Sequence, residues 1–269
     1  MGRPALTFPT AAAPLLAAAA AVAMLLASPA LASSIADLQA KAEAGRAEAQ
    51  MALGLEFYRG DEAPADMQRA VTWFRKAADQ GYAPAEAMIA SLYAEGAGVP
   101  YDRKQSAAWL RRAASHGLSQ AQVALGRAHD EGNGVARDEH EAVRWYQAAA
   151  AQGDAEGQHL LGQAYLYGRG VARDAPKALG LLRAAAEKGN ADAQDDLGRL
   201  YEDGGALPLD LVQARKWFVL AASNCKTSRT CDAAARDGLR VKAKMSVIEI
   251  KASDDGIQAW SAKRIQPAG

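Results

Sequence analysis

Apolar and small residues recur along the chain at the spacing of amphipathic helices. Between residues 119 and 131, Ala121, Leu125, Gly126 and His129 fall on one face of a helical pattern. Gly132 follows, and a glycine ends a helix at little cost because it readily adopts the left-handed backbone conformation. The pattern therefore predicts a helix that ends at Gly132.

A second helix is predicted directly after this turn. Asp138 is placed to accept hydrogen bonds from the free backbone N–H groups at its start, and Gly153 is placed to end it. Trp145 shares its apolar face with three alanines. Because Gly126 and these alanines lack bulky side chains, we expect neighbouring helices to approach closely, with Trp145 filling the remaining space between them.

The helix pair repeats with a period of 36 residues. At this shift four tryptophans come into register (Trp73, Trp109, Trp145, Trp217), as do five aspartates (Asp66, Asp102, Asp138, Asp174, Asp210) and five glycines (Gly60, Gly96, Gly132, Gly168, Gly204). Chance does not align independent columns at one period. We therefore predict five repeats, which start at Ala47, Ala83, Ser119, Ala155 and Ala191. One helix pair cannot bury its apolar side alone, so the repeats must stack.

The fourth repeat shows the repeated motif most completely. It contains Leu161-Gly162, Tyr165, Gly168-Arg169-Gly170-Val171, Asp174 and Lys177-Ala178. This motif resembles Sel1-like repeats, which are relatives of tetratricopeptide repeats with a longer loop. The resemblance covers about Ala47–Asn224. It implies an all-α fold, a right-handed α-solenoid of about five 36-residue helix-turn-helix repeats with helical caps, and it indicates little about function.

The first 32 residues resemble a cleaved export signal. Arg3 is their one charged residue, an alanine- and leucine-rich run follows, and Ala30-Leu31-Ala32 matches the small-x-small pattern that signal peptidase cleaves. The alternative is an uncleaved membrane anchor, but the run is shorter than the roughly 20 residues that span a bilayer. We predict cleavage between Ala32 and Ser33, a periplasmic or secreted mature protein, and no stable membrane insertion after cleavage.

The segments outside the repeats are predicted to act as caps. Residues 33–46 fit the second helix of a missing repeat, and residues 225–269 are predicted to form a disulfide loop and C-terminal capping helices. Cys225 and Cys231 lie six residues apart in a chain expected to leave the cytoplasm, so we predict a disulfide between them, with free thiols as the alternative. Ser246 and Glu249 fit a capping box that opens the last helix.

Composition and charge argue against several further classes of fold and function. The 31 basic residues balance 31 acidic residues, and a neutral chain does not support a nucleic-acid binder. Hydrophobic residues reach 50% but aromatic residues only 6%, which argues against a β-sandwich. We expect no cofactor and no metal site. The repeated Gly-x-Gly lacks the third glycine and the preceding strand of a dinucleotide motif, and no two histidines fall at a helical metal spacing.

The remaining functional signal is expected on the surface of the first helices. By analogy with tetratricopeptide repeats, these helices line a concave groove. We assign to it positions that vary from repeat to repeat, and the predicted partner-binding residues are Met51, Leu55, Tyr58, Arg127, Asp130, His159, Gln163, Arg199 and Glu202. A groove that changes from apolar to charged suits an extended peptide or a partner helix.

Two functions from different classes follow from these features. The first is a non-enzymatic periplasmic interaction module, an adaptor or regulator that holds another protein; family precedents restrain a sensor kinase or organise envelope polysaccharide machinery. The second is a cell-wall-active or β-lactam-binding enzyme on the same scaffold. Its support is Ser223-x-x-Lys226, a four-residue match to penicillin-binding enzymes without a Ser-Asp-Asn partner, and a faint Lys226-Thr227-Ser228 echo of Lys-Thr-Gly. The resemblance adds that some secreted Sel1-repeat proteins are linked to β-lactam binding. The sequence favours the interaction module.

Overall fold

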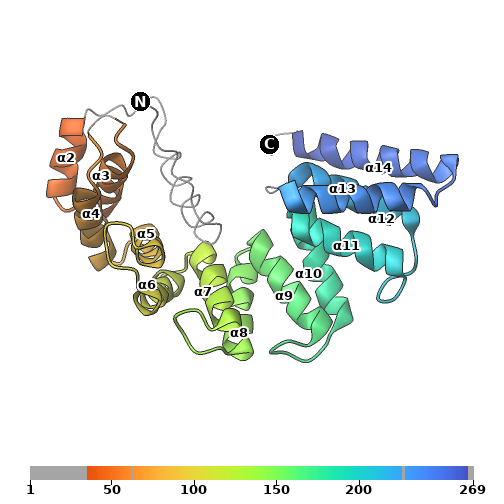
Figure 1. The fold of residues 1–269 in the computed structure, drawn as a ribbon, viewed down its shortest axis with the longest axis horizontal. Coiled ribbons are helices and arrows are strands. Elements are labelled where there is room, and N and C mark those ends of the chain that lie inside the picture. Colours follow the sequence, from red (N-terminus) through yellow and green to blue (C-terminus); the bar gives the residue numbers. More distant parts are fainter. Residues whose placement is uncertain (1–34, 62–63, 226–227, 266–269) are drawn as a thin grey trace. The chain divides into compact units, whose positions relative to one another are not determined.

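The protein is built from paired helices. A computed structural model describes residues 35–61, 64–225 and 228–265, which form thirteen α-helices and no strand. The helices are α2 (Ile35–Glu43), α3 (Ala47–Arg59), α4 (Met67–Asp79), α5 (Ala83–Glu95), α6 (Arg103–Ser115), α7 (Ser119–Glu131), α8 (Glu139–Ala151), α9 (Ala155–Tyr167), α10 (Ala175–Glu187), α11 (Ala191–Asp203), α12 (Leu211–Asn224), α13 (Ser228–Lys242) and α14 (Val247–Ile265) (Figure 1). The chain divides into two compact parts, an N-terminal part up to Ala149 and a C-terminal part from Ala150. The fold is the all-α solenoid that the sequence predicts.

Aspartates and glycines set the ends of the helices, as the sequence predicts. Oδ1 of Asp138 accepts hydrogen bonds from the backbone N–H groups of His140 and Glu141 at 3.0 and 3.1 Å. The aspartates at the same position of the other repeats also accept hydrogen bonds from backbone N–H groups at the start of their own second helices (Asp66, Asp102, Asp174, Asp210). The glycine after each first helix has a φ angle of 68° to 74°, which explains why glycine stands at each of these positions.

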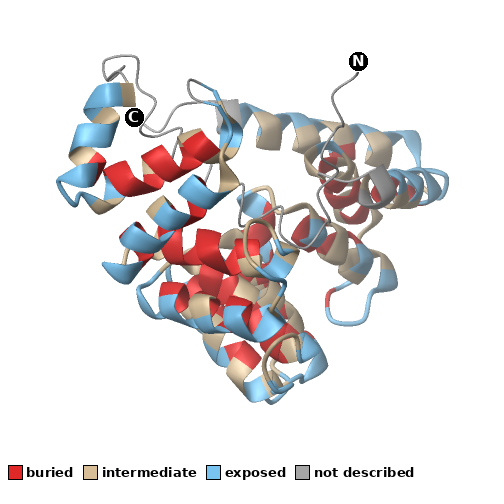
Figure 2. Ribbon diagram, turned by 60° about the vertical axis from the view of Figure 1, so that its left-hand side comes forward, coloured by how far each residue is buried: buried red, intermediate tan, exposed pale blue. Residues whose placement is uncertain are grey.

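Glycines in the first helices admit large side chains from the second helices. A Cβ atom on Gly54 would lie 2.6 Å from the Phe74 ring, and one on Gly198 would lie 2.7 Å from the Phe218 ring. Both phenylalanines are fully buried, and buried residues follow the inner faces of the helices (Figure 2). These contacts are too close for any residue but glycine without a shift of the helices.

Trp145 packs between helices of adjacent repeats, as predicted, but another ring fills the space above Gly126. The ring of Tyr146, one residue later, packs on Gly126, and Tyr146 is only 2% exposed. Trp145 is half-buried and packs at the edge of a cluster that contains Leu125. Successive residues of a helix point about 100° apart, so only one of the two rings can face the first helix.

Additional helices continue the helical structure at both ends of the repeats. α2 lies within the predicted N-terminal cap, and Ala42 on it is buried in the first core cluster. At the other end, the Glu249 carboxylate accepts hydrogen bonds from the Ser246 backbone N–H and hydroxyl, both at 2.7 Å, which confirms the predicted capping box. These bonds hold the pKa of Glu249 below its usual value.

The C-terminal helices keep the register of the repeat. Ser246 stands 36 residues after Asp210, and Ala234 stands 36 residues after Gly198. Both α13 and α14 pack against α12. Ala234 is 2% exposed, so this small residue is buried as Gly198 is. The residues 225–269 therefore contain two helices in the places of a sixth repeat.

A disulfide joins Cys225 to Cys231, with a Cα–Cα distance of 5.5 Å. It links the end of α12 to the first turn of α13. The predicted export signal and the Ala32–Ser33 cleavage site lie outside the described residues. Among the helices that are described, none has both the length and the apolar character needed to cross a membrane.

Candidate functional site

Met51 and Leu55 lie in the core and do not line an open groove. They are 1% and 6% exposed, in a cluster that also includes residues of α2, α4 and α5. α3 packs against both α2 and α4, and the two side chains, one turn apart, fall on its covered side. Their prediction as groove residues is therefore wrong, because variation between repeats does not imply exposure.

Tyr58 and Glu95 form a polar pair at the surface of the N-terminal part. Tyr58 is half-buried, and burial together with the negative charge of Glu95 raises the pKa of its hydroxyl. Burial also raises the pKa of Glu95, whose Oε1 is buried and has no hydrogen-bond partner among the described residues. Because this oxygen is inaccessible to solvent, a partner can reach only the exposed remainder of the Tyr58 and Glu95 side chains.

The two predicted residues of α7 have different surroundings. Asp130 accepts a hydrogen bond of 2.7 Å from the Tyr146 hydroxyl, so its carboxylate is engaged within the repeat. Arg127 lies three residues earlier and is exposed. Of these two residues, Arg127 is the more accessible to a partner.

His159 is buried in the C-terminal part, which overturns its assignment to an exposed groove. It is 5% exposed, and its Nε2 lies 2.9 Å from Oδ2 of Asp196. Gln163 donates from Nε2 to the same carboxylate oxygen at 2.8 Å. Asp196 on α11 thus joins two predicted residues of α9, and the sequence analysis missed it because it looked only for positions assumed to be exposed.

Arg199 takes part in a second polar cluster. Its guanidinium contacts Asp195 on its own helix at 2.8 Å and Asp237 on α13 at 3.1 Å. Burial raises the pKa of Asp195 despite its contact with Arg199. The guanidinium is therefore held between two carboxylates rather than left without a partner.

Glu202 completes the contact between α11 and α13. Its carboxylate lies 2.6 Å from Arg240 Nη2 and 3.1 Å from Lys244 Nζ. Burial alone would raise the pKa of Glu202, but the hydrogen bonds from the two cations hold it below its usual value. The predicted residues at this end thus fix α13 on α11, which limits what they offer to a partner.

The histidines and acidic residues of the described segments do not gather into a metal site. No group of three or more histidine, cysteine, aspartate or glutamate side chains within these segments is placed to hold a metal ion. His116 instead contacts Glu86, at 2.7 Å, and His129 lies 3.2 Å from the carbonyl oxygen of Ala136. These histidines contact groups of the protein itself.

Comparison with known families decides the classification. The Sel1 repeat profile matches five consecutive segments, residues 47–82, 83–118, 119–154, 155–190 and 191–224. Their starts are those predicted from the period of 36. The chain belongs to the Sel1 repeat family. Sel1 repeat proteins are generally protein-interaction modules, and the fold is typically a non-enzymatic scaffold. No curated protein sequence matches the chain significantly.

Two solved structures show the same repeat fold. One is a protective antigen present in uropathogenic Escherichia coli strains; it is 40% identical, with a TM-score of 0.68 over 71% of this chain. The present chain spans 41% of that protein's length. The other is a Sel1 repeat protein from Oxalobacter formigenes, 34% identical, with a TM-score of 0.62 over 72% of this chain and 76% of that one.

A polar link between adjacent Sel1 repeats was missed by the sequence analysis. Gln194 donates from Nε2 to the carbonyl oxygen of Ala186 at 2.9 Å, and its Oε1 accepts from Asn224 at 3.0 Å. Gln50 and Gln122 donate to equivalent carbonyl oxygens at 3.1 and 3.0 Å. A glutamine that recurs every 36 residues on a buried helix face was the available signal.

The second repeat makes this link with different side chains. Glu86 replaces the glutamine and is fully buried, but an ionised carboxylate cannot donate a hydrogen bond. Arg112 donates instead to the carbonyl oxygen of Ala78 at 2.9 Å and also contacts Glu86 at 2.9 Å. The Ala78 carbonyl oxygen at the repeat junction therefore still accepts a hydrogen bond.

The serine of the proposed Ser-x-x-Lys match lies on the exposed side of α12. The Ser223 hydroxyl donates to the carbonyl oxygen of Val219 at 2.9 Å. Lys226 lies outside the described residues. This contact is the ordinary bond of a serine to its own helix and adds no support for an enzyme.

Proposed function

We propose that this chain is an exported interaction module that holds another protein against the first helices of its repeats. Tyr58 and Glu95 carry this proposal, because both side chains are half-buried at the surface of first helices and bring a hydroxyl and a carboxylate near each other. The partner is proposed to contact Arg127 as well, since that side chain is exposed on α7.

The proposed location is the periplasm or the extracellular space. The export-signal pattern of residues 1–32 supports it, as does a disulfide between Cys225 and Cys231, because disulfides persist in oxidising compartments. By family precedent, the proposed role is that of an adaptor or regulator, of a sensor kinase or of envelope polysaccharide machinery. Sequencing of the mature N-terminus tests the location: Ser33 is expected, and retention of Met1 with membrane fractionation would contradict it.

The binding proposal is tested by crosslinking the protein to its partners in the periplasm. We compare wild-type protein with Tyr58→Ala, Glu95→Gln and a control, Leu209→Ala, whose leucine is 65% exposed in the loop before α12. The expected result is one captured protein, reduced at least fivefold by the first two substitutions and unchanged by the third. Equal capture by all four proteins, each folded by circular dichroism, would contradict the proposal.

A further inference from the structure

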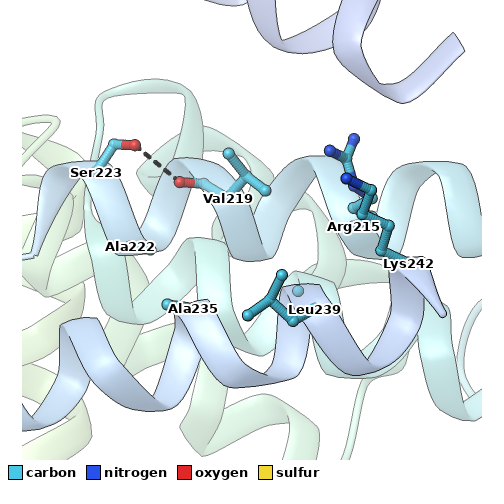
Figure 3. Close-up of a pocket in the computed structure, with 8 residues that line it drawn as sticks. Arg215, Val219, Ala222, Ser223, Ala235, Leu239 and Lys242 are labelled. Atoms are coloured by element: carbon cyan, nitrogen blue, oxygen red, sulfur yellow. Dashed lines mark hydrogen bonds between the residues drawn. The ribbon is translucent and has the colours of Figure 1, made fainter. Parts of the chain in front are cut away.

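A separate apolar groove lies between α12 and α13 in the C-terminal part. The cavity has a volume of about 340 Å³, and Val219 and Ala222 line it from α12 while Ala235, Gly238 and Leu239 line it from α13 (Figure 3). Leu239 is 66% exposed, so its side chain is accessible to a partner. Ala222, Ala235 and Gly238 form the floor of the groove, and the Leu239 side chain lies along one side of it.

The groove departs from the pattern of the repeats. Val219 occupies the position of Arg75, Arg111, Gln147 and Arg183 in the four preceding repeats. In the first and fourth repeats the arginine at this position reaches a tyrosine of the next repeat; Arg75 donates to the Tyr93 hydroxyl at 2.6 Å, and Arg183 donates to the Tyr201 hydroxyl at 3.2 Å. The fifth repeat has an apolar side chain at this place instead. Stacking of the repeats therefore does not explain the apolar lining.

The helices that form the groove are strongly basic. Residues 211–244 contain eight basic residues and two acidic ones, a net charge of +6 in a chain whose net charge is zero. Lys242 lines one end of the groove and is exposed. Arg215 lies at the same end and contacts Asp254 on α14 at 2.7 Å. Of the two acidic residues, Asp237 is turned toward Arg199 and Arg240.

We propose that the α12–α13 groove binds an acidic amphipathic helix of a partner protein. Apolar side chains on one face of that helix enter the groove beside Leu239, and carboxylates along its edge face Lys242. Arg215, Arg240 and Lys244 are already held by carboxylates of α14 and α11. This inference rests on the proposed function as an interaction module but uses a different surface from Tyr58 and Glu95.

The shape and lining of the groove favour a helix over other anionic partners. A protein that binds a lipid bilayer would present a protruding apolar surface, whereas the floor of this groove is recessed between two helices. A single-stranded nucleic acid would be expected to stack on aromatic rings, and no described residue that lines the groove is aromatic. A protein helix supplies both the protruding apolar side chains and the carboxylates.

The test measures fluorescence anisotropy with a labelled 16-residue probe. The probe carries leucines at helical i, i+3, i+4 spacing and glutamates elsewhere, and a matched probe replaces each glutamate by lysine. We expect the acidic probe to bind and the basic probe to bind at least tenfold more weakly. Leu239→Asp and Lys242→Glu should each weaken binding of the acidic probe at least tenfold, and added salt should weaken it further.

Leu209→Asp is the matched control, because Leu209 is 65% exposed but lies in the loop before α12. It should change binding less than twofold. Absence of binding, equal binding of the two probes, or equal loss with Leu209→Asp would overturn the inference. Binding to phosphatidylglycerol vesicles that Leu239→Asp abolishes, without binding of the acidic probe, would assign the groove to lipid instead. Tyr58→Ala should leave probe binding unchanged, so failure here is distinct from failure of the proposed function.

Discussion

Leu55 and Ala235 occupy the same position of the repeat, five periods of 36 residues apart, but have opposite surroundings. Leu55 in the first repeat is 6% exposed and belongs to the core. Ala235 in the C-terminal cap is exposed and lines an open groove. The position in the repeat fixes where a side chain points, whereas the neighbouring elements decide whether anything covers it.

The largest effect is expected for the rings that pack on the glycines of the first helices. Phe74→Ala should lower the free energy of unfolding by about 3–5 kcal/mol, because it leaves a cavity above Gly54. Trp145→Ala should cost less, since Trp145 is only half-buried. Urea unfolding of both variants checks this order, and a larger loss for Trp145→Ala would reverse our assignment of the core column.

Glu86→Ala should have the next largest effect. It removes the acceptor that holds Arg112 and His116, and we expect a loss of about 1–3 kcal/mol. Glu86→Gln should be milder, because the amide can donate to the Ala78 carbonyl as Gln194 donates to that of Ala186. If thermal melts show the glutamine variant to be the less stable of the two, the proposed equivalence of the links is wrong.

Loss of the disulfide should have a moderate effect. Replacing Cys225 and Cys231 with serine should lower stability by about 2 kcal/mol, because the closed loop is short. The fold should persist, since both α13 and α14 pack on α12. Circular dichroism melts of the oxidised protein and the double variant check this. Complete unfolding of the variant at 25 °C would show that the disulfide, and not packing, holds the cap.

The smallest effect is expected at the capped helix start of Asp138. Bonds from the backbone N–H groups of Glu141 and His140 hold the pKa of Asp138 below its usual value. A carboxyl group with a lowered folded-state pKa stabilises the fold above its unfolded pKa, and the contribution is lost as the pH falls through the folded pKa. Asp138→Ala should therefore lower the melting temperature slightly at pH 7, and the difference should shrink in acid. An unchanged difference at pH 2 would contradict this.

The sequence predicted the repeats because their helix ends depend on local chemistry. Asp138 and Gly132 act through the backbone of their own repeat, so a period of 36 was enough to locate them. The candidate surface depends on contacts between repeats. The burial of His159 follows from a contact with Asp196, 37 residues away. Similarly, the pattern did not show which ring packs on Gly126, because Trp145 and Tyr146 are adjacent and both aromatic.

The most direct test compares an aspartate at the two equivalent positions. Leu55→Asp places a charge in the core and should lower the free energy of unfolding by more than about 3 kcal/mol. Ala235→Asp places the same charge in an exposed groove and should cost less than about 1 kcal/mol. Urea unfolding of the two variants measures both. Equal losses, or a larger loss at residue 235, would contradict the claim that one repeat position is core in the first repeat and open surface in the cap.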